Sequence, residues 1–473
     1  MRKNWRVGRR AAVIVAALAA CAAFAARASA APVQGFIQVN PATLAASNPF
    51  GPCLALASGI NCYVPDEIRA AYDYPAALDG SGQTIVIVDA FHHPFVERDL
   101  AIFDFLFGIP DPPDFVQLQG PRVTPPGIPV GDQNTWARET ALDVEWAHAM
   151  APGARIVLIE AATDDDADIA AAERAFLPLY PGAVVSQSFG VPEPFVNPAS
   201  LAAYHSLYQA AIARGGTIVA ATGDVGANWA PFLGPDAPAL AAYPASDPLV
   251  TAVGGTQGLT HDGSDYGFGL LTPAQTYGDE QVWNEPFAGA TGGAPSVLFA
   301  APPWQRPVSP YKTRTVPDVA YNAALDGGVY VWFSKDDPSG PDYGKNGLGI
   351  ASGTSVAAPQ WAAIFALADQ ARAAAGKGPL GFANESLYKI AKQNKTAGAF
   401  HDITVGNNAF MSNVGFSAAP GYDAASGLGT PDVGALIPAL VAASASSNPD
   451  AGAPAAVQPG TTGNLKPHRM LPG

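Results

Sequence analysis

The sequence predicts an α/β fold in which a parallel sheet carries helices on both faces. Short apolar runs alternate with helical patterns along the first half of the chain. The runs are at 84–88, 155–160, 183–186 and 217–221, and the helical patterns lie near 97–107, 137–149, 167–178 and 198–214. This alternation is typical of repeated strand–helix units. Hydrophobic residues make up 48% of the 473 residues, which is enough for a large core.

The first thirty residues predict an export signal. Basic residues precede an apolar run at 11–26, and Ala28-Ser29-Ala30 follows as a signal peptidase requires. The run is shorter than the roughly 20 residues that span a bilayer. We therefore expect cleavage after Ala30, a secreted product, and no membrane association once the signal is removed. The pair Arg9-Arg10 leaves twin-arginine export open.

The rest of the chain divides into three segments. Residues 31–52 are interpreted as a short irregular leader and 53–442 as one elaborated α/β domain. Residues 443–473, rich in Ala, Ser, Pro and Gly, predict a disordered tail. In an oxidising compartment, Cys53 and Cys62 are expected to form a small-loop disulfide.

The charge balance excludes several classes of partner. The formal net charge is -15, whereas nucleic acid and anionic membranes require clustered Lys and Arg. Three cysteines are also too few for a four-ligand zinc cluster. A binder of nucleic acid or lipid headgroups is therefore not expected.

The string Ser352-Gly353-Thr354-Ser355-x-x-x-Pro359 is the first candidate for chemistry. It leads into an apolar helical stretch, so Ser355 is predicted at a helix N-terminus, where free N–H groups favour a developing negative charge. A simple capping serine is the alternative. The whole string is much rarer than a cap, and it resembles the nucleophile segment of serine peptidases with a subtilisin-like fold.

A serine nucleophile needs a base, which is histidine in subtilisins. No histidine of this chain stands in the His-Gly-Thr setting of a subtilisin, and His148 is interpreted as structural. A histidine-dependent mechanism therefore lacks its base. A lipase-like nucleophile elbow is also excluded at 184–190, because the first glycine of Gly-x-Ser-x-Gly is missing.

Two carboxylates offer a substitute base. Glu139 and Asp143 stand at i and i+4 of a predicted helix that begins at Trp136, so they share one face. On a solvated helix such a pair would carry no function, but the apolar neighbours here favour burial. Two buried carboxyls in contact share a proton, with one pKa lowered and the other raised. Glu139 would then take the proton of Ser355, while Asp143 holds Glu139 in place and adjusts its pKa.

Two aspartates follow predicted strands, at the edge of the sheet where ligands bind. Asp89 follows the run at 84–88, and Asp224 follows the run at 217–221 in Ala-Thr-Gly-Asp-Val-Gly. A turn aspartate is the plain alternative for Asp224. In a closed site, a raised pKa would keep Asp224 protonated, and it could donate a hydrogen bond to an oxyanion.

Taken in order, these motifs resemble the sedolisin family, the serine-carboxyl peptidases with a subtilisin-like fold. The resemblance covers roughly residues 62–440 and includes ETALDVEWAHAMAPGA, ATGDVG and the Ser355 string. It implies a secreted, acid-active serine-type endopeptidase that forms an acyl-enzyme. Ser355 would be the nucleophile, Glu139 the general base and acid, Asp143 its partner, and Asp224 the oxyanion-hole acid. The partner would be a protein or peptide substrate, and a monomer is the default expectation.

The resemblance also implies one structural calcium ion near the C-terminus. Its carboxylates would come from Asp402 and Asp423, and its backbone carbonyls from Ile403, Ala419 and Gly421. Waters would complete the six to eight oxygen ligands of calcium. The family often has glycine where Ala419 stands, which a backbone carbonyl tolerates. It also usually has a long propeptide, whereas the predicted leader here is short, and its glycine-rich cleft segment reads Gly292-Gly293-Ala294-Pro295-Ser296.

Two alternatives remain open from the sequence. The first is a catalytically silent relative that binds peptides, although all four chemical positions are filled. The second is a tripeptidyl-peptidase, which would need a blocked cleft and a group that binds an amine.

Overall fold

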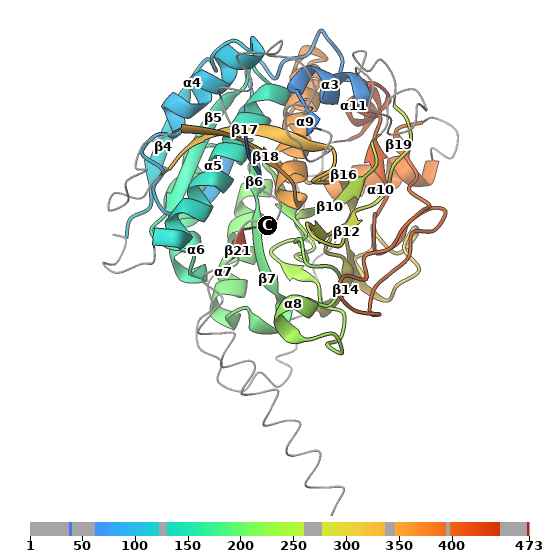
Figure 1. The fold of residues 1–473 in the computed structure, drawn as a ribbon. Coiled ribbons are helices and arrows are strands. Elements are labelled where there is room, and N and C mark those ends of the chain that lie inside the picture. The colour runs from blue at the N-terminus through green and yellow to red at the C-terminus, as the bar shows by residue number, and fades with distance from the viewer. Residues whose placement is uncertain are drawn as a thin grey trace, which may run out of the picture.

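The predicted α/β fold is confirmed by the computed structural model (Figure 1). The structure describes residues 37–39, 62–122, 130–259, 277–335, 346–393, 398–444 and 471–472. The predicted signal peptide, Cys53, and most of the predicted leader and tail lie outside these residues. Cys62 is disulfide-bonded. Within the described ranges, none of the helices is both long enough and apolar enough to cross a membrane.

An eight-stranded sheet runs through the molecule in the order β11-β10-β8-β6-β3-β5-β4, with β16 also paired to β10. Its strands are β3 (Thr84–Ala90), β4 (Phe115–Gln119), β5 (Arg155–Ala161), β6 (Val184–Gln187), β8 (Thr217–Ala221), β10 (Thr251–Gln257), β11 (Gln281–Val282) and β16 (Val319–Asn322). Only β11 pairs in the antiparallel sense. The apolar runs of the sequence are thus buried parallel strands, as their composition requires.

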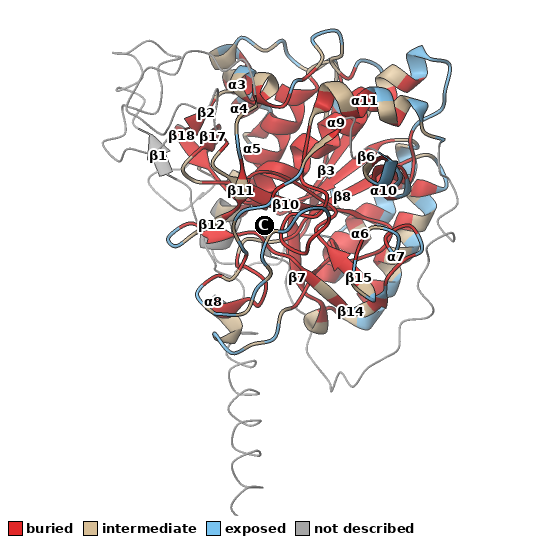
Figure 2. Cartoon of the chain, turned by 90° about the vertical axis from the view of Figure 1, so that its right-hand side faces the viewer, coloured by how far each residue is buried: buried red, intermediate tan, exposed pale blue. Residues whose placement is uncertain are grey.

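Helices cover both faces of this sheet (Figure 2). The described helices are α3 (Pro65–Ala71), α4 (Val96–Phe107), α5 (Val130–Met150), α6 (Asp166–Phe176), α7 (Pro198–Ile212), α8 (Ala230–Leu233), α9 (Thr354–Ala374), α10 (Ala383–Gln393) and α11 (Val433–Ala442), with short 3-10 turns η2 (Leu177–Leu179) and η3 (Glu193–Phe195). α9 packs against α5, α11 and the central strands, while α6 and α7 pack together against the sheet. Every residue of α9 from 354 to 369 is buried, because its many alanines let the backbones approach closely.

One helix differs from its predicted bounds in a way that matters for the site. α5 begins at Val130 and not near 137. Residues 132–136 contain no glycine or proline that would interrupt a helix. Glu139 and Asp143 therefore lie in the middle of a long helix, where the backbone is held from both sides.

Short strands complete the fold around the main sheet. They are β1 (Ile37–Val39), β2 (Cys62–Tyr63), β7 (Phe189–Pro192), β9 (Ala242–Tyr243), β12 (Asn284–Glu285), β13 (Gly289–Ala290), β14 (Ala294–Ala300), β15 (Thr313–Val316), β17 (Gly328–Ser334), β18 (Asn346–Ala351), β19 (Phe400–His401), β20 (Thr430–Pro431) and β21 (Leu471–Pro472). Two of them differ from the expectations for the ends of the chain. β1 lies in the predicted irregular leader and pairs with β18, and β21 lies in the predicted disordered tail and pairs with β7. Each of the two strands forms by pairing with the edge of a strand in the main body of the fold.

Candidate active site

Ser355 lies in the first turn of α9 and is fully buried, with 0% of its surface exposed. The residue before this helix, Gly353, has φ of +120°. A Cβ atom at Gly353 would lie 2.3 Å from Oδ2 of Asp224. Glycine is therefore required for two reasons, the backbone conformation and the close approach of a carboxyl to the start of the helix.

Asp224 follows β8 and is held by Thr354, a residue to which the sequence assigned no role. Oδ1 of Asp224 accepts from the backbone N–H of Thr354 at 2.7 Å and from its hydroxyl at 2.9 Å. The N–H of Gly223 donates to the same hydroxyl oxygen at 3.0 Å. Burial raises the pKa of Asp224 to about 6, and the Thr354 hydrogen bonds partly oppose this shift. One oxygen of Asp224 is thus occupied, and the other faces Gly353.

Glu139 and Asp143 project from α5 into the interior, with exposed fractions of 1% and 0%. Asp143 Oδ1 accepts a hydrogen bond from the Ser188 hydroxyl at 2.9 Å. Within the described part of the chain, Asp143 Oδ2 and both Glu139 oxygens make no hydrogen bond. Both oxygens of Glu139 therefore remain open to a new hydrogen-bond partner.

The pKa values of the two carboxyls differ from the expectation of one lowered and one raised. Burial raises the pKa of both Glu139 and Asp143 well above the ordinary range. The Ser355 hydroxyl lies near enough to Glu139 to oppose its shift, although the two side chains do not meet at ordinary hydrogen-bond geometry. Such contacts commonly tighten only when substrate binds. Both pKa values rise because burial penalises charge and the cluster adds further negative neighbours.

Asp89 is a third carboxyl in this cluster. It stands at the carboxyl end of β3, is fully buried, and contributes electrostatic repulsion to both Glu139 and Asp143. Burial raises the pKa of Asp89 to about 8, with the Thr140 hydroxyl opposing and Glu160 adding to the shift. Its position after an apolar run was the signal in the sequence, but nothing there indicated that it would meet α5.

The described histidines lie elsewhere. They are His92, bound to Glu160; His93, 3.3 Å from Asp99; His148, 3.3 Å from Asp104; His205, bound to Asp247; and His401, stacked on Tyr277. His261 and His468 lie outside the described residues. Among the described residues, the group placed to serve Ser355 is therefore a carboxyl and not an imidazole.

The residues predicted to bind calcium lie on one loop cluster, in which Asp402, Ala419 and Gly421 are exposed, whereas Ile403 and Asp423 are buried. The N–H of Gly421 donates to Asp402 Oδ2 at 2.9 Å, and the N–H of Ala419 donates to Asp423 Oδ2 at 2.9 Å. The backbone carbonyls of Ile403, Ala419 and Gly421 accept no hydrogen bond from another described backbone group. Carboxylates beside free carbonyl oxygens are the donor set that calcium prefers, so these residues fit the ion.

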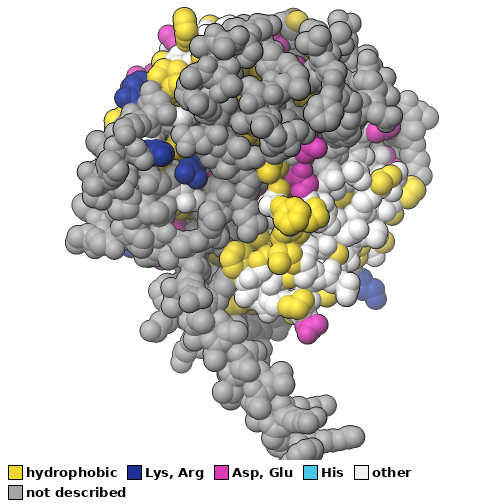
Figure 3. Space-filling model, in the orientation of Figure 1, with side chains coloured by type: hydrophobic (Ala, Val, Ile, Leu, Met, Phe, Trp, Pro, Cys, Tyr) yellow, Lys and Arg dark blue, Asp and Glu magenta, His cyan; other side chains and the backbone are white. Residues whose placement is uncertain are grey.

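An apolar rim lies next to Asp224. The backbone N–H of Ala290, in the β12–β13 hairpin, donates to the Asp224 carbonyl at 2.9 Å. Phe287, at the tip of this hairpin, is 99% exposed. Figure 3 shows hydrophobic side chains gathered on the part of this face where Figure 1 places α8 and β12.

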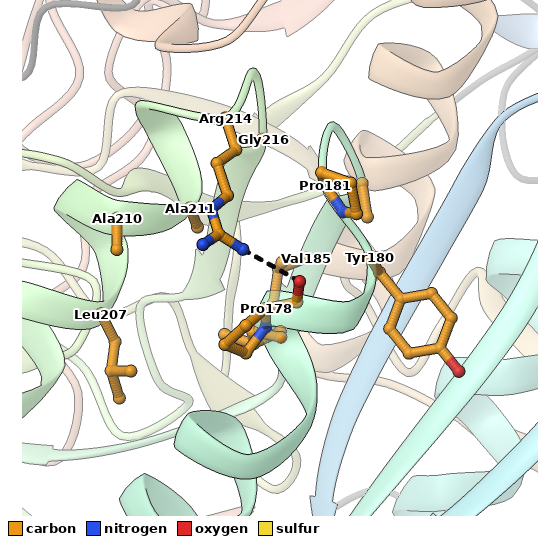
Figure 4. A pocket seen from close by; sticks show the side chains of 11 residues that line it. Pro178, Tyr180, Pro181, Val185, Leu207, Ala210, Ala211, Arg214 and Gly216 are labelled. Carbon is orange, nitrogen blue, oxygen red and sulfur yellow. Dashed lines mark hydrogen bonds between the residues drawn. The ribbon is translucent and has the colours of Figure 1, made fainter.

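A small pocket of about 60 Å³ lies far from these groups (Figure 4). Ala183 and Gly216, which line it, precede β6 and β8, so the pocket is at the amino ends of the strands. The Arg214 guanidinium at its edge donates to the Pro178 carbonyl at 3.0 Å. Ser355 and Asp224 lie at the opposite, carboxyl end of the sheet, so this pocket is not part of the site.

Comparison with known proteins gives consistent matches. A sequence model of the subtilase family matches residues 132–410. The chain is 33% identical over 398 residues to kumamolisin from Bacillus sp. strain MN-32, covering 82% of this chain and 65% of kumamolisin. It is 32% identical over 272 residues to tripeptidyl-peptidase 1 from Canis lupus familiaris, covering 54% of this chain and 42% of that protein. It therefore spans less than two thirds of either relative.

A match to a solved structure covers a larger share of the matched protein than the sequence matches do. A solved structure of Pseudomonas sedolisin, described as a serine-carboxyl proteinase in complex with two molecules of pseudo-iodotyrostatin, superposes with a TM-score of 0.67 at 26% sequence identity. The match covers 80% of this chain and 98% of that one. The match thus covers most of this chain and nearly all of that one, which supports the same fold.

Proposed function

Because the chain belongs to the subtilase family, in its sedolisin branch of serine-carboxyl peptidases, we propose that it is a secreted, acid-active endopeptidase. The observation that carries this proposal is the meeting of Ser355 at the start of α9 with a buried carboxyl pair on α5 and the Asp224 carboxyl after β8. A nucleophile, a base and an acid from three separate elements converge on one point. That combination suits acyl transfer.

In the first step the carboxyl pair carries one proton, on Asp143, and Glu139 is ionised. The Ser355 hydroxyl oxygen attacks the scissile carbonyl carbon while its proton passes to Glu139. The proton then moves from Glu139 to the leaving amine, the C–N bond breaks, and an ester joins the acyl group to Ser355. Water hydrolyses this ester by the same route in reverse. Asp143, which accepts a hydrogen bond from Ser188, holds the proton of the pair and so stabilises the ionised form of Glu139.

Asp224 acts on the carbonyl oxygen. As the oxyanion forms, a protonated Asp224 donates a hydrogen bond to it, and the N-terminus of α9 adds free N–H groups. Thr354 occupies Oδ1 of Asp224 with two donors, which directs the proton to Oδ2. The same carboxyl in its ionised form would repel the oxyanion.

We therefore expect activity to be confined to acid pH. The folded pKa of Asp224 is raised to about 6, so the donor is present below that pH and is lost as pH rises through it. Hydrolysis of a denatured protein, measured from pH 2.5 to 8, should show kcat falling about tenfold per pH unit above about 6. Activity that peaks near neutrality would contradict this mechanism. No hydrolysis by folded protein at any pH would favour the silent peptide-binding relative.

A tripeptidyl-peptidase is the second candidate, favoured by the similarity to tripeptidyl-peptidase 1. The two activities differ in whether the substrate needs a free amino terminus. Matched fluorogenic peptides with free and acetylated amino termini would separate them. Equal cleavage of both supports the endopeptidase, and loss of cleavage on acetylation supports the tripeptidyl-peptidase.

We propose that Asp402 and Asp423, with the carbonyls of Ile403, Ala419 and Gly421, hold one structural calcium ion. When bound, the ion would join the loop at 419–423 to the segment after β19 and stabilise the folded state. The proposal is supported by the two carboxylates and the unpaired carbonyls of this loop cluster.

Removal of calcium with EGTA is expected to lower Tm. An ion present at 100 times its Kd contributes about 2.7 kcal/mol to the free energy of unfolding, which corresponds to several °C. Differential scanning fluorimetry of Asp402→Asn should show that this calcium-dependent shift is lost. Asp236→Asn, at an exposed aspartate outside the loop cluster, should retain it. An unchanged wild-type Tm in EGTA would contradict the calcium site.

Residues 1–30 are proposed to direct export and to be removed, which leaves a soluble monomeric enzyme. Mass spectrometry of the secreted protein would test this, with Ala31 expected as the new amino terminus.

A further inference from the structure

Strand β7 connects the catalytic cluster to an edge that a second chain segment occupies. It begins at Phe189, directly after Ser188, whose hydroxyl donates to Asp143. One edge of β7 pairs with β9 in the register Val191↔Tyr243. The other edge pairs with β21, which makes β7 the middle strand of three.

The second segment comes from the distant C-terminal tail. β21 is antiparallel to β7, with Leu471 opposite Gly190 and Pro472 opposite Phe189. From Leu471 to Pro472, the paired residue of β7 therefore moves one position closer to Ser188. β21 also contacts α5, the helix that carries Glu139 and Asp143. Figure 1 shows β21 beside β7 near the middle of the molecule.

This edge is where an extended peptide would meet the catalytic groups. A peptide in extended form binds to a free strand edge through main-chain hydrogen bonds, with little demand on its side chains. A peptide that followed β7 toward Ser188 would be led to Asp143, and from there to Glu139 and Ser355. The tail takes the same edge and runs in that direction.

The catalytic groups are closed off from solvent in this arrangement. Ser355 and Glu139 are exposed by 0% and 1%, and Ser188 by 0%. Ser355 therefore offers no exposed surface to a substrate in this arrangement. The tail segment at β21 lies against both elements that frame these residues, β7 and α5.

We propose that the segment at Leu471–Pro472 is an internal competitive inhibitor that binds the substrate edge of β7. The inference rests on the proposed peptidase function of the same site. Residues 443–470 tether β21 to the end of α11, and a tethered ligand has an effective concentration on the order of mM. Even a weak occupant then lowers the fraction of molecules that are open to substrate. The apparent KM rises by the inverse of that fraction, and kcat at saturation is unchanged.

Steady-state kinetics of two variants test the proposal. A chain that lacks residues 471–473 should show a KM at least threefold lower than the full chain, with kcat unchanged. Leu471→Pro should act in the same direction, because Pro472 has no N–H and Leu471 is the only residue of β21 that can donate to β7. A deletion of 451–453, which leaves β21 in place, should keep the KM of the full chain. Equal KM values for all four proteins would overturn the proposal.

Hydrogen exchange separates failure of this proposal from failure of the peptidase assignment. In a Ser355→Ala background, which prevents self-cleavage, loss of residues 471–473 should speed exchange of the amides of Phe189 and Gly190, the residues that β21 pairs with. A synthetic peptide of residues 463–473 should restore the protection. Unchanged exchange would overturn the inhibitory strand even if the enzyme is active. If the deletion speeds exchange but the wild-type protein hydrolyses no substrate, the result would support binding of β21 to β7 and would contradict the proposed peptidase function.

Discussion

Ser355→Ala and Glu139→Gln are each expected to lower kcat by a factor on the order of 10⁶, to the level left by binding and the oxyanion site alone. The first change removes the nucleophile. The second leaves a side chain of the same shape that cannot accept the Ser355 proton. Because the two residues act in one step, the double variant should be no worse than either single variant. Hydrolysis of a denatured protein near pH 4 by purified variants measures the loss.

Glu173→Gln is the matched control for this experiment. Glu173 is also a fully buried glutamate, neither of its oxygens makes a hydrogen bond within the described chain, and burial raises its pKa to about 8. It lies on α6, away from α5 and α9. This variant should therefore keep activity within about twofold. If Glu139→Gln retained a tenth of the wild-type rate while folded, another group would be the base.

Asp224→Ala is expected to lower kcat by about 10²- to 10³-fold below about pH 6, where wild-type Asp224 is protonated, the usual effect of removing one oxyanion donor. Above that pH the difference from the wild type should shrink, because the wild type loses the same donor. Asp224→Asn should behave differently, because an amide can both accept from Thr354 at Oδ1 and donate from its nitrogen without titrating. The asparagine variant should therefore keep more activity than the alanine variant. Its pH profile should also lose the decline that begins near pH 6.

The pH profile of Asp224→Asn shows which carboxyl group causes the loss of activity above about pH 6. If the decline above about pH 6 persists in Asp224→Asn, the proton that limits activity belongs to the carboxyl pair or to Asp89, whose pKa values burial also raises. Thermal unfolding of each variant at pH 4 and pH 7 should be compared with the wild type. A loss of activity that follows a loss of folded protein would not count against Asp224.

Much of the site could be predicted because its signals are local. The glycine and apolar residues around Ser355 predict that a helix begins there. Glu139 and Asp143 are predicted to share a face because they are four residues apart on a helix. Four of the eight strands of the main sheet, β3, β5, β6 and β8, were found within one or two residues of their bounds for the same reason. The start of α5 was missed because polar residues at 132–135 carry no hydrophobic period.

Other features depend on contacts between distant parts of the chain. Ser188 lies 45 positions from Asp143, and Thr354 lies 130 positions from Asp224, yet each pair is hydrogen-bonded. No pattern in the sequence indicates that a serine between two strands, or a threonine beside Ser355, will hold a carboxyl of the candidate site. The strands β1 and β21 were missed similarly, since a short strand is specified by the edge it joins and not by its own residues.

The sequence by itself determined the class of fold, the family and the candidates for the reacting groups, because strand and helix periods, motif spacing and the missing histidine base are all properties of short segments. The tertiary structure alone decided the pKa values of those groups, their hydrogen-bond partners and the chain segments that lie next to them. It buried three carboxyls together and so raised their pKa values, fixed Asp224 through Thr354, and laid β21 along the edge of β7. Desolvation, long-range hydrogen bonds and strand pairing act between residues that only folding brings into contact, so they cannot be read from their order in the chain.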